Sequence, residues 1–225
     1  MIDTKQLRCV LGWLGALLPL IVLILSLVFG FGVPDSISAT YYLAPCTTPF
    51  MIILGAASIL LFCYKGYDAH DSLICTLAAI FALGICLFPC DTEGLIARWT
   101  HLAELSHVGT FQIIPKISGI LHNLCAFGFF GLLAYNSIFL FTKSSGNMTE
   151  NKKKRNIIFR VCGIGMAVSF LVIVPISIFN WWGGVWLVET IALALFGLSW
   201  LTKADRYHWL FADEKSKGCD CYGKE

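Results

Sequence analysis

Residues 9–34 read CVLGWLGALLPLIVLILSLVFGFGVP, and these 26 residues include no charged side chain. An α-helix rises about 1.5 Å per residue, so roughly 20 apolar residues cross the hydrocarbon core of a bilayer. The stretch is therefore long enough to span a membrane. A cleaved signal peptide is the alternative, because Lys5 and Arg8 precede the run. The run is longer than the roughly 7–15 apolar residues of a signal peptide, which favours a retained span.

The whole chain has the composition of a membrane protein. Hydrophobic residues make up 57% of it and charged residues 13%, and the mean hydropathy is +0.76. The charged share is about half that of a water-soluble domain. The net charge is only +2, and the basic residues stand in short blocks between apolar runs, so we expect no nucleic-acid partner. The composition excludes an ordinary water-soluble globule and a disordered chain.

Five further apolar runs have the length at which a helix satisfies its own backbone groups inside lipid. The six predicted spans are residues 9–34, 44–64, 72–90, 117–142, 161–179 and 185–202. A single bent span over the last two runs is the alternative. We predict an all-α, polytopic membrane protein whose single transmembrane domain fills residues 1–225, with residues 203–225 as a tail.

The basic residues predict the orientation of these spans. With both termini in the cytoplasm, 14 of the 16 Lys and Arg residues fall on the cytoplasmic side, and only Arg98 and Lys116 fall outside. Loops rich in Lys and Arg remain cytoplasmic, so this alternation predicts cytoplasmic termini and a multi-pass protein of the cell membrane. The basic block at residues 152–155 holds its loop inside, and it would also attract anionic lipid.

Two of the ten cysteines stand at places that suggest a disulfide. Cys46 and Cys90 mark the outer ends of the second and third spans, which are antiparallel neighbours. They should therefore lie at similar height on the oxidising side of the membrane. We treat them as a disulfide candidate, whereas a thiol inside a span is usually a small apolar filler.

Ionisable residues at hydrocarbon depth are the strongest functional signal, because a buried charge there costs at least about 2.5 kcal/mol. Glu189 lies five residues into the last span, and His122 lies six residues beyond Lys116 in the fourth. Both are predicted roughly 7 to 9 Å below the outer surface. Helix geometry places Ser118 on the same face as His122.

The outer loops bring further polar residues toward this depth. Asp91 follows the third span, and Ser38 and Tyr41 lie between the first and second spans. We predict that these side chains, with Glu189, His122 and Ser118, form one outward-facing cavity that binds a lipid or small amphiphile. The alternative is that the intramembrane polar groups only fix helix packing.

The likeness to known proteins rests on five segments: Ser36–Tyr42, Lys65–Tyr67, Ala82–Pro89, Lys153–Asn156 and Glu189–Leu201. These segments resemble a group of small six-span bacterial membrane proteins whose activity is uncharacterised. The resemblance implies a bacterial inner membrane.

A remoter resemblance rests on Phe111-Gln112, then His122 in the fourth span and Glu189 early in the sixth. In this order the chain is similar to the DRAM/Sfk family of six-span proteins, although Thr190 stands where that family has Trp. The resemblance implies cytoplasmic termini and lipid as the ligand class.

The Ser118 and His122 pair also resembles one element of the ceramidase-type membrane hydrolases, which use a zinc-activated water. Such zinc chemistry needs three protein ligands and an open position. The last span contains no histidine, so Asp91, His101 or His107 would have to serve from a loop. We therefore predict a binding protein with membrane lipids as partners and no cofactor. A zinc-dependent lipid hydrolase, a proton-coupled transporter and a structural membrane protein are the alternatives, and a homo-oligomer is left open.

Overall fold

A computed structural model describes residues 3–91, 115–144, 149–179, 181 and 183–204. Within these ranges the chain is helical and has no strand. The elements are α1 (Thr4–Val28), the short 3-10 helix η1 (Ser38–Tyr42), α2 (Ala44–Cys63), α3 (Ala69–Leu87), α5 (Pro115–Tyr135), the π-helical turn η3 (Asn136–Leu140), α6 (Glu150–Ile178) and α7 (Gly184–Ala204). Six helices, counting α5 with η3 as one, are long and apolar enough to cross a membrane. The predicted all-α, six-span architecture is confirmed.

Capping residues account for the differences between predicted and observed helix ends. Asp3 accepts a hydrogen bond from the Lys5 N–H, so α1 starts before its apolar run, and it ends before Gly30, whose φ is +80°. Thr149 caps α6 in the same way. As a result, the basic block at 152–155 lies in the first turns of α6 rather than in a loop, and this helix begins eleven residues before the predicted boundary at 161.

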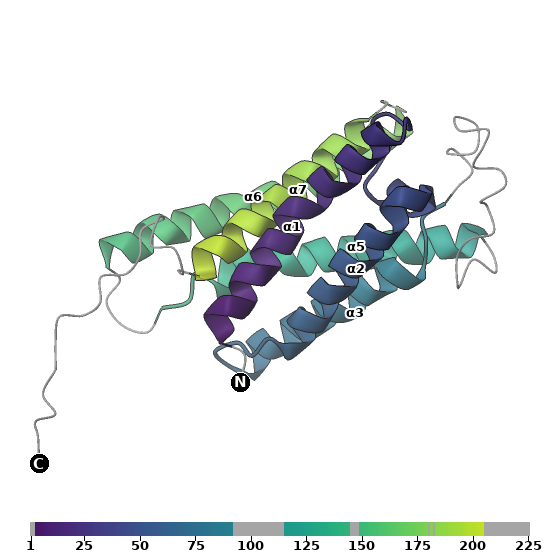
Figure 1. The fold of residues 1–225 in the computed structure, drawn as a ribbon. Coiled ribbons are helices and arrows are strands. Elements are labelled where there is room, and N and C mark those ends of the chain that lie inside the picture. The colour runs from purple at the N-terminus through teal and green to yellow at the C-terminus, as the bar shows by residue number, and fades with distance from the viewer. Residues whose placement is uncertain (1–2, 92–114, 145–148, 180, 182, 205–225) are drawn as a thin grey trace, which may run out of the picture.

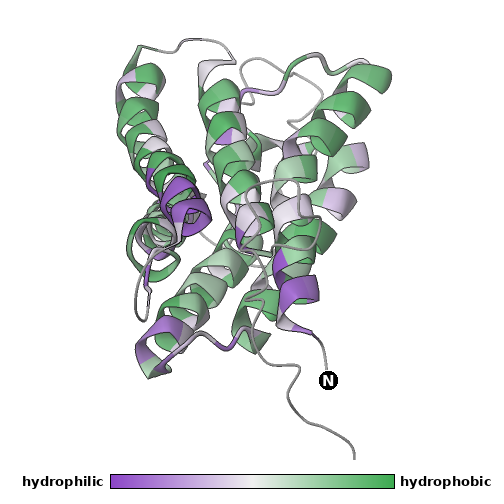
Figure 2. Ribbon diagram, turned by 90° about the vertical axis from the view of Figure 1, so that its left-hand side faces the viewer, coloured by the Kyte–Doolittle hydropathy of each residue, from purple (hydrophilic) through white to green (hydrophobic). Residues whose placement is uncertain are grey.

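The six helices form a closed ring. Each helix packs against the next one along the chain, and α7 completes the ring by packing against α1 (Figure 1). Apolar residues follow the middle of the helices and hydrophilic residues gather toward their ends (Figure 2). The largest fully buried side chains include Trp200, Phe196, Phe141 and Phe159, which pack around the end of the ring where α1 begins.

Two glycines allow α1 and α7 to approach closely. A Cβ atom added to Gly197 would lie 2.8 Å from the carbonyl oxygen of Gly12 and 2.9 Å from Cβ of Ala16. Lipid supplies no hydrophobic force between helices, so close packing of small residues is the main source of their association. The first and last helices are therefore joined at a contact that tolerates no side chain.

We predict that Gly197→Ala destabilises the ring by about 1–3 kcal/mol, because the new methyl group would meet backbone atoms of α1. Gly131→Ala is the matched control, since a Cβ there meets no atom within 4 Å. Thermal unfolding in detergent should show a clear loss for the first variant and little change for the second. Equal melting temperatures would contradict the close contact.

Candidate functional site

A non-membrane-spanning segment of the chain is buried at one end of the ring. Residues 37–43 connect α1 to α2, and their side chains, other than Ser38, are at most 7% exposed. A buried backbone needs internal hydrogen-bond partners, because burial removes it from bulk water. The Thr40 hydroxyl donates to the Ile37 carbonyl at 2.6 Å, and Ser36 accepts from the Ala39 N–H at 2.9 Å.

Glu189 supplies the hydrogen-bond acceptor for the backbone amides at the start of residues 37–43. Its side chain projects from α7 and accepts hydrogen bonds from the backbone N–H groups of Ile37 and Ser38. These amides head η1 and have no carbonyl partner within that short helix, so a carboxylate is well suited to them. The backbone N–H of Trp186 also donates to the backbone carbonyl of Asp35 at 3.0 Å. The start of α7 therefore holds the connection between α1 and α2 in place.

A pocket lies beside Glu189, with a volume of about 40 Å³. All six membrane-spanning helices contribute to its wall. Ten of its lining residues are apolar, and Glu189 and Ser38 are the two polar ones. The apolar residues are Leu18, Ile37, Phe50, Leu54, Ile85, Ala126, Phe129, Phe130, Phe170 and Leu193. A space of this size holds on the order of three water molecules, or the end of a hydrocarbon chain.

His122 and Ser118 lie on one face of α5, as their spacing predicts. Nδ1 of His122 is 2.8 Å from the carbonyl oxygen of Phe88, and the Ser118 hydroxyl donates to the carbonyl of Pro89 at 2.8 Å. A carbonyl only accepts, so His122 carries its proton on Nδ1. The two side chains thus satisfy consecutive carbonyls just beyond the end of α3. Neither is among the residues that line the Glu189 pocket, and a ligand role for them stays a prediction.

The other predicted site residues are placed as follows. Tyr41 is buried and packs edge-on against Tyr42 and Phe50. Asp91 is exposed and lies against Gly119 of α5. Within the part of the chain described, Ser38 is the predicted partner that shares a pocket with Glu189. His101, His107, Arg98 and the Phe111-Gln112 pair fall outside the described residues.

Tyr42 connects the buried segment to the end of α3. Its hydroxyl donates to the carbonyl of Cys90 at 2.6 Å, and burial raises the pKa of this phenol, so it remains a donor at any working pH.

We predict that Tyr42→Phe costs about 1–3 kcal/mol of stability, because a buried carbonyl loses a partner. Tyr41→Phe is the control, since no hydrogen bond from the Tyr41 hydroxyl is found among the described residues. Thermal unfolding in detergent measures the stability of both variants. An equal loss of stability in Tyr42→Phe and Tyr41→Phe would contradict this role of Tyr42.

The predicted disulfide between Cys46 and Cys90 is wrong. Both are free thiols. Cys46 faces α1, where its thiol donates to the Val22 carbonyl at 3.4 Å, while the Cys90 backbone is bonded by Tyr42. The Cys46 thiol is therefore directed at α1 and not at Cys90.

Cys90 is a poor nucleophile in this fold. Burial raises the pKa of its thiol to about 12, and the Glu189 carboxylate adds to the effect. We predict that N-ethylmaleimide labels Cys90 in the folded protein far more slowly at pH 8 than it labels the exposed Cys63, because the thiolate is the reactive form. In denaturant without reductant, peptide mass spectrometry should find Cys46 and Cys90 both labelled. If the two cysteines were labelled only after a reductant had been added, the Cys46–Cys90 disulfide would be present after all.

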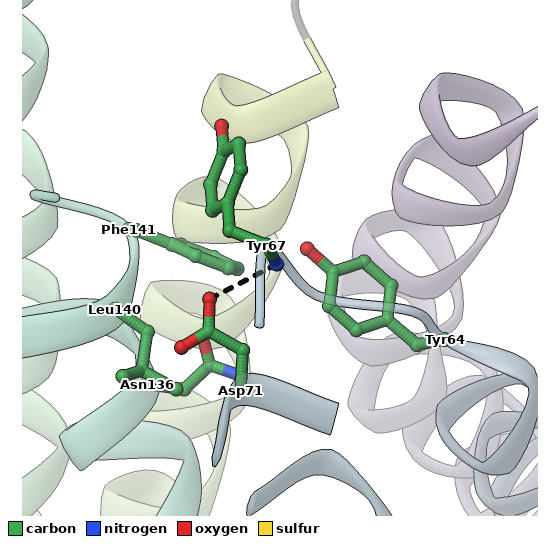
Figure 3. Close-up of a pocket in the computed structure, with 6 residues that line it drawn as sticks. All are labelled: Tyr64, Tyr67, Asp71, Asn136, Leu140 and Phe141. Carbon is green, nitrogen blue, oxygen red and sulfur yellow. Dashed lines mark hydrogen bonds between the residues drawn. The ribbon is translucent and has the colours of Figure 1, made fainter. Parts of the chain in front are cut away.

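A second polar cluster lies where α3 begins, with Asp71 beside Tyr67 and Asn136 (Figure 3). Asp71 is 3% exposed, and its carboxylate accepts from the Tyr67 N–H at 3.1 Å and from the Lys143 ammonium. Lys143 also pairs with Asp68 at 2.9 Å. The small pocket between Asp71 and Asn136 does not admit a water molecule. Lys143 therefore ties the segment after η3 to the start of α3 by bridging two carboxylates.

Metal-binding geometry is found at this same end. Among the described residues, Asp68, His70 and Asp71 have ligand atoms within 4.8 Å of one another. Both carboxylates are already paired with Lys143. This group does not include His122, so the described part of the chain assembles no zinc set around the Ser118 and His122 pair.

The sequence reasoning missed Asp71 and Lys203. Asp71 immediately precedes the predicted third span and Lys203 immediately follows the predicted sixth, so neither was counted as lying at hydrocarbon depth. The helices extend to include both, and each is less than 9% exposed. Asp68, an N-cap residue type, was the available signal that α3 begins earlier.

The chain was compared with protein-family models, with curated proteins and with solved structures, and none of them matches it.

Proposed function

We propose that this multi-pass membrane protein binds a lipid or small amphiphile, with the head group at Glu189 and the adjoining methylene groups in the pocket beside it. The observation that carries the proposal is the pocket wall, in which nine apolar side chains from the six helices, together with Ile37, surround a space that also contacts one carboxylate and one hydroxyl. Ligand sites commonly combine such an apolar lining with a few placed polar groups. The distribution of Lys and Arg would put this pocket in the outer half of a cell membrane.

Glu189 supplies the polar recognition in this proposal. A carboxylate has about four acceptor positions, and the amides of Ile37 and Ser38 occupy two of them. The remaining positions can accept from an ammonium, hydroxyl or amide group of a ligand. Glu189 and Ser38 are both only partly buried, so a head group can reach them. The favoured ligand is a single-chain amphiphile that carries a hydrogen-bond donor, above all a cationic one.

A structural role is the second candidate, and a specific observation favours it. Glu189 already anchors residues 37 and 38 through the backbone. If Glu189 serves only to anchor these residues, removal of its charge changes the stability of the protein and leaves amphiphile binding unchanged.

We predict that Glu189→Gln weakens dodecylammonium binding by about tenfold, because a charge-assisted hydrogen bond becomes a neutral one. Binding of dodecanol should change far less, since the chain is identical and the head group is uncharged. Native mass spectrometry of the protein in detergent measures both. Glu150→Gln is the matched control, because Glu150 is exposed and lies on a different helix.

A second variant tests the pocket itself. Leu193 lies one helical turn from Glu189 and lines the same space. Leu193→Trp should fill the cavity and reduce the binding of dodecylammonium and dodecanol alike. Unchanged binding of both amphiphiles in Leu193→Trp and Glu189→Gln, with a lower melting temperature in the latter, would leave the structural role in place of the binding role.

A further inference from the structure

Helices α5 and α6 diverge toward the Glu189 end of the ring (Figure 1). Toward the other end they pack tightly, because a Cβ atom added to Gly163 of α6 would lie 2.8 Å from the carbonyl oxygen of Ala134 of α5. Near the middle, the centre of the Phe170 ring lies 4.9 Å from that of Phe127 and 4.6 Å from that of Phe130. Helix α6 continues for eight residues beyond Phe170, which is roughly 12 Å of helix.

Beyond these rings the facing surfaces of α5 and α6 are exposed. Two helical turns comprise about seven residues, so Ile120 lies on the same face of α5 as Phe127 and Ala134. The exposed fraction along this face rises from 4% at Ala134 to 44% at Phe127 and 67% at Ile120. On α6, Ser177 lies on the face of Phe170 and is exposed, whereas Phe170 is buried. The seam between the two helices is therefore open from the rings to the Glu189 end.

Three other pairs of neighbouring helices are joined at this end. The Cys46 thiol of α2 donates to the Val22 carbonyl of α1. Ser118 of α5 donates to a carbonyl just after α3. A Cβ atom added to Gly184 of α7 would lie 2.7 Å from the side chain of Ile176 of α6. Such contacts hold these pairs together at the depth at which the seam between α5 and α6 is open.

The pocket beside Glu189 adjoins the open seam. Phe130 and Phe170 belong both to the pocket wall and to the ring contacts between α5 and α6. Nine of the twelve lining residues are buried, and the partly exposed ones are Ser38, Ala126 and Glu189. Ala126 directly precedes Phe127 on α5. The exposed part of the pocket wall therefore lies between α5 and the start of α7, next to the seam.

The pocket is too small for a whole hydrocarbon chain. Its volume of about 40 Å³ admits only the methylene groups next to a head group. The rest of a bound chain must leave the pocket, and it stays out of water only if the exit leads into lipid. Ile120 and Val174 are exposed apolar residues on the two sides of the seam, so they suit a hydrocarbon chain.

We infer that the ligand of the Glu189 pocket is an amphiphile that resides in the bilayer and enters sideways between α5 and α6. Its chain remains in the open seam while its head group reaches Glu189. This inference rests on the proposed function, because it concerns the same pocket. It narrows the ligand class to amphiphiles whose chain is longer than the pocket, and it excludes short water-soluble amines.

Photolabelling locates the chain. The probe is hexadecylammonium with a diazirine near the middle of its chain, added to the full chain in phosphatidylcholine nanodiscs. Excess dodecylammonium distinguishes label bound at the site from general labelling of the lipid-facing surface. Peptide mass spectrometry should find the competed label on residues 120–127 and 170–178. Competed label on another pair of helices would overturn this inference and leave the pocket proposal in place, whereas the absence of any competed label would overturn both.

A matched pair of variants on α6 tests the seam independently. Val174 lies one turn beyond Phe170 at the edge of the opening, and Val161 is a similarly exposed valine toward the other end of the helix. Val174→Trp should lower the affinity for hexadecylammonium at least about fivefold, because the indole ring would occupy the path of the chain. Val161→Trp should change it less than about twofold. Native mass spectrometry measures both affinities, and thermal unfolding checks that both variants fold. Equal affinities in the two folded variants would overturn the inference.

Discussion

The hydrogen bonds from the backbone of Ile37 and Ser38 to the Glu189 carboxylate are the interaction on which this end of the bundle depends. A segment that enters the membrane region without being a full helix exposes polar backbone groups that lipid cannot satisfy. Glu189 resolves this problem from a helix 152 residues away in sequence. The same bonds hold Ser38 at the edge of the pocket. The anchoring of the backbone therefore also sets which polar groups line the pocket.

The two ends of the ring solve the problem of buried charge in opposite ways. At the Glu189 end a single carboxylate is matched to backbone amides, and His122 and Ser118 are matched to backbone carbonyls. At the other end, side-chain ions pair with one another, as Lys143 does with Asp68 and Asp71, or rest on aromatic rings, as Lys203 does. The first end is mainly apolar around one acid, and the second combines a lysine paired with two carboxylates and a lysine that lies over aromatic rings.

Hydropathy alone was sufficient to predict six spans, because the length and spacing of apolar runs follow directly from bilayer thickness. It also identified Glu189 as an acid inside a span, and the structure places that residue at a pocket. Hydropathy could not predict how each helix is rotated about its own axis, and so which neighbour each side chain faces. The rise per residue gives the height of Cys46 and Cys90, but their direction depends on packing with α1. Likewise, the partners of Glu189 are backbone amides, which have no signature in the sequence.

The junction between Gly12 and Gly197 has a consequence for biogenesis. Helix α7 carries the glycine that closes the ring, the acid that anchors residues 37 and 38, and Lys203, which donates to the Phe141 carbonyl. A nascent chain that has inserted only its first five helices lacks all three. Its α1 presents the glycine face to lipid, and the connection to α2 has no carboxylate to receive its amides. The ring can therefore close only after translation has delivered α7.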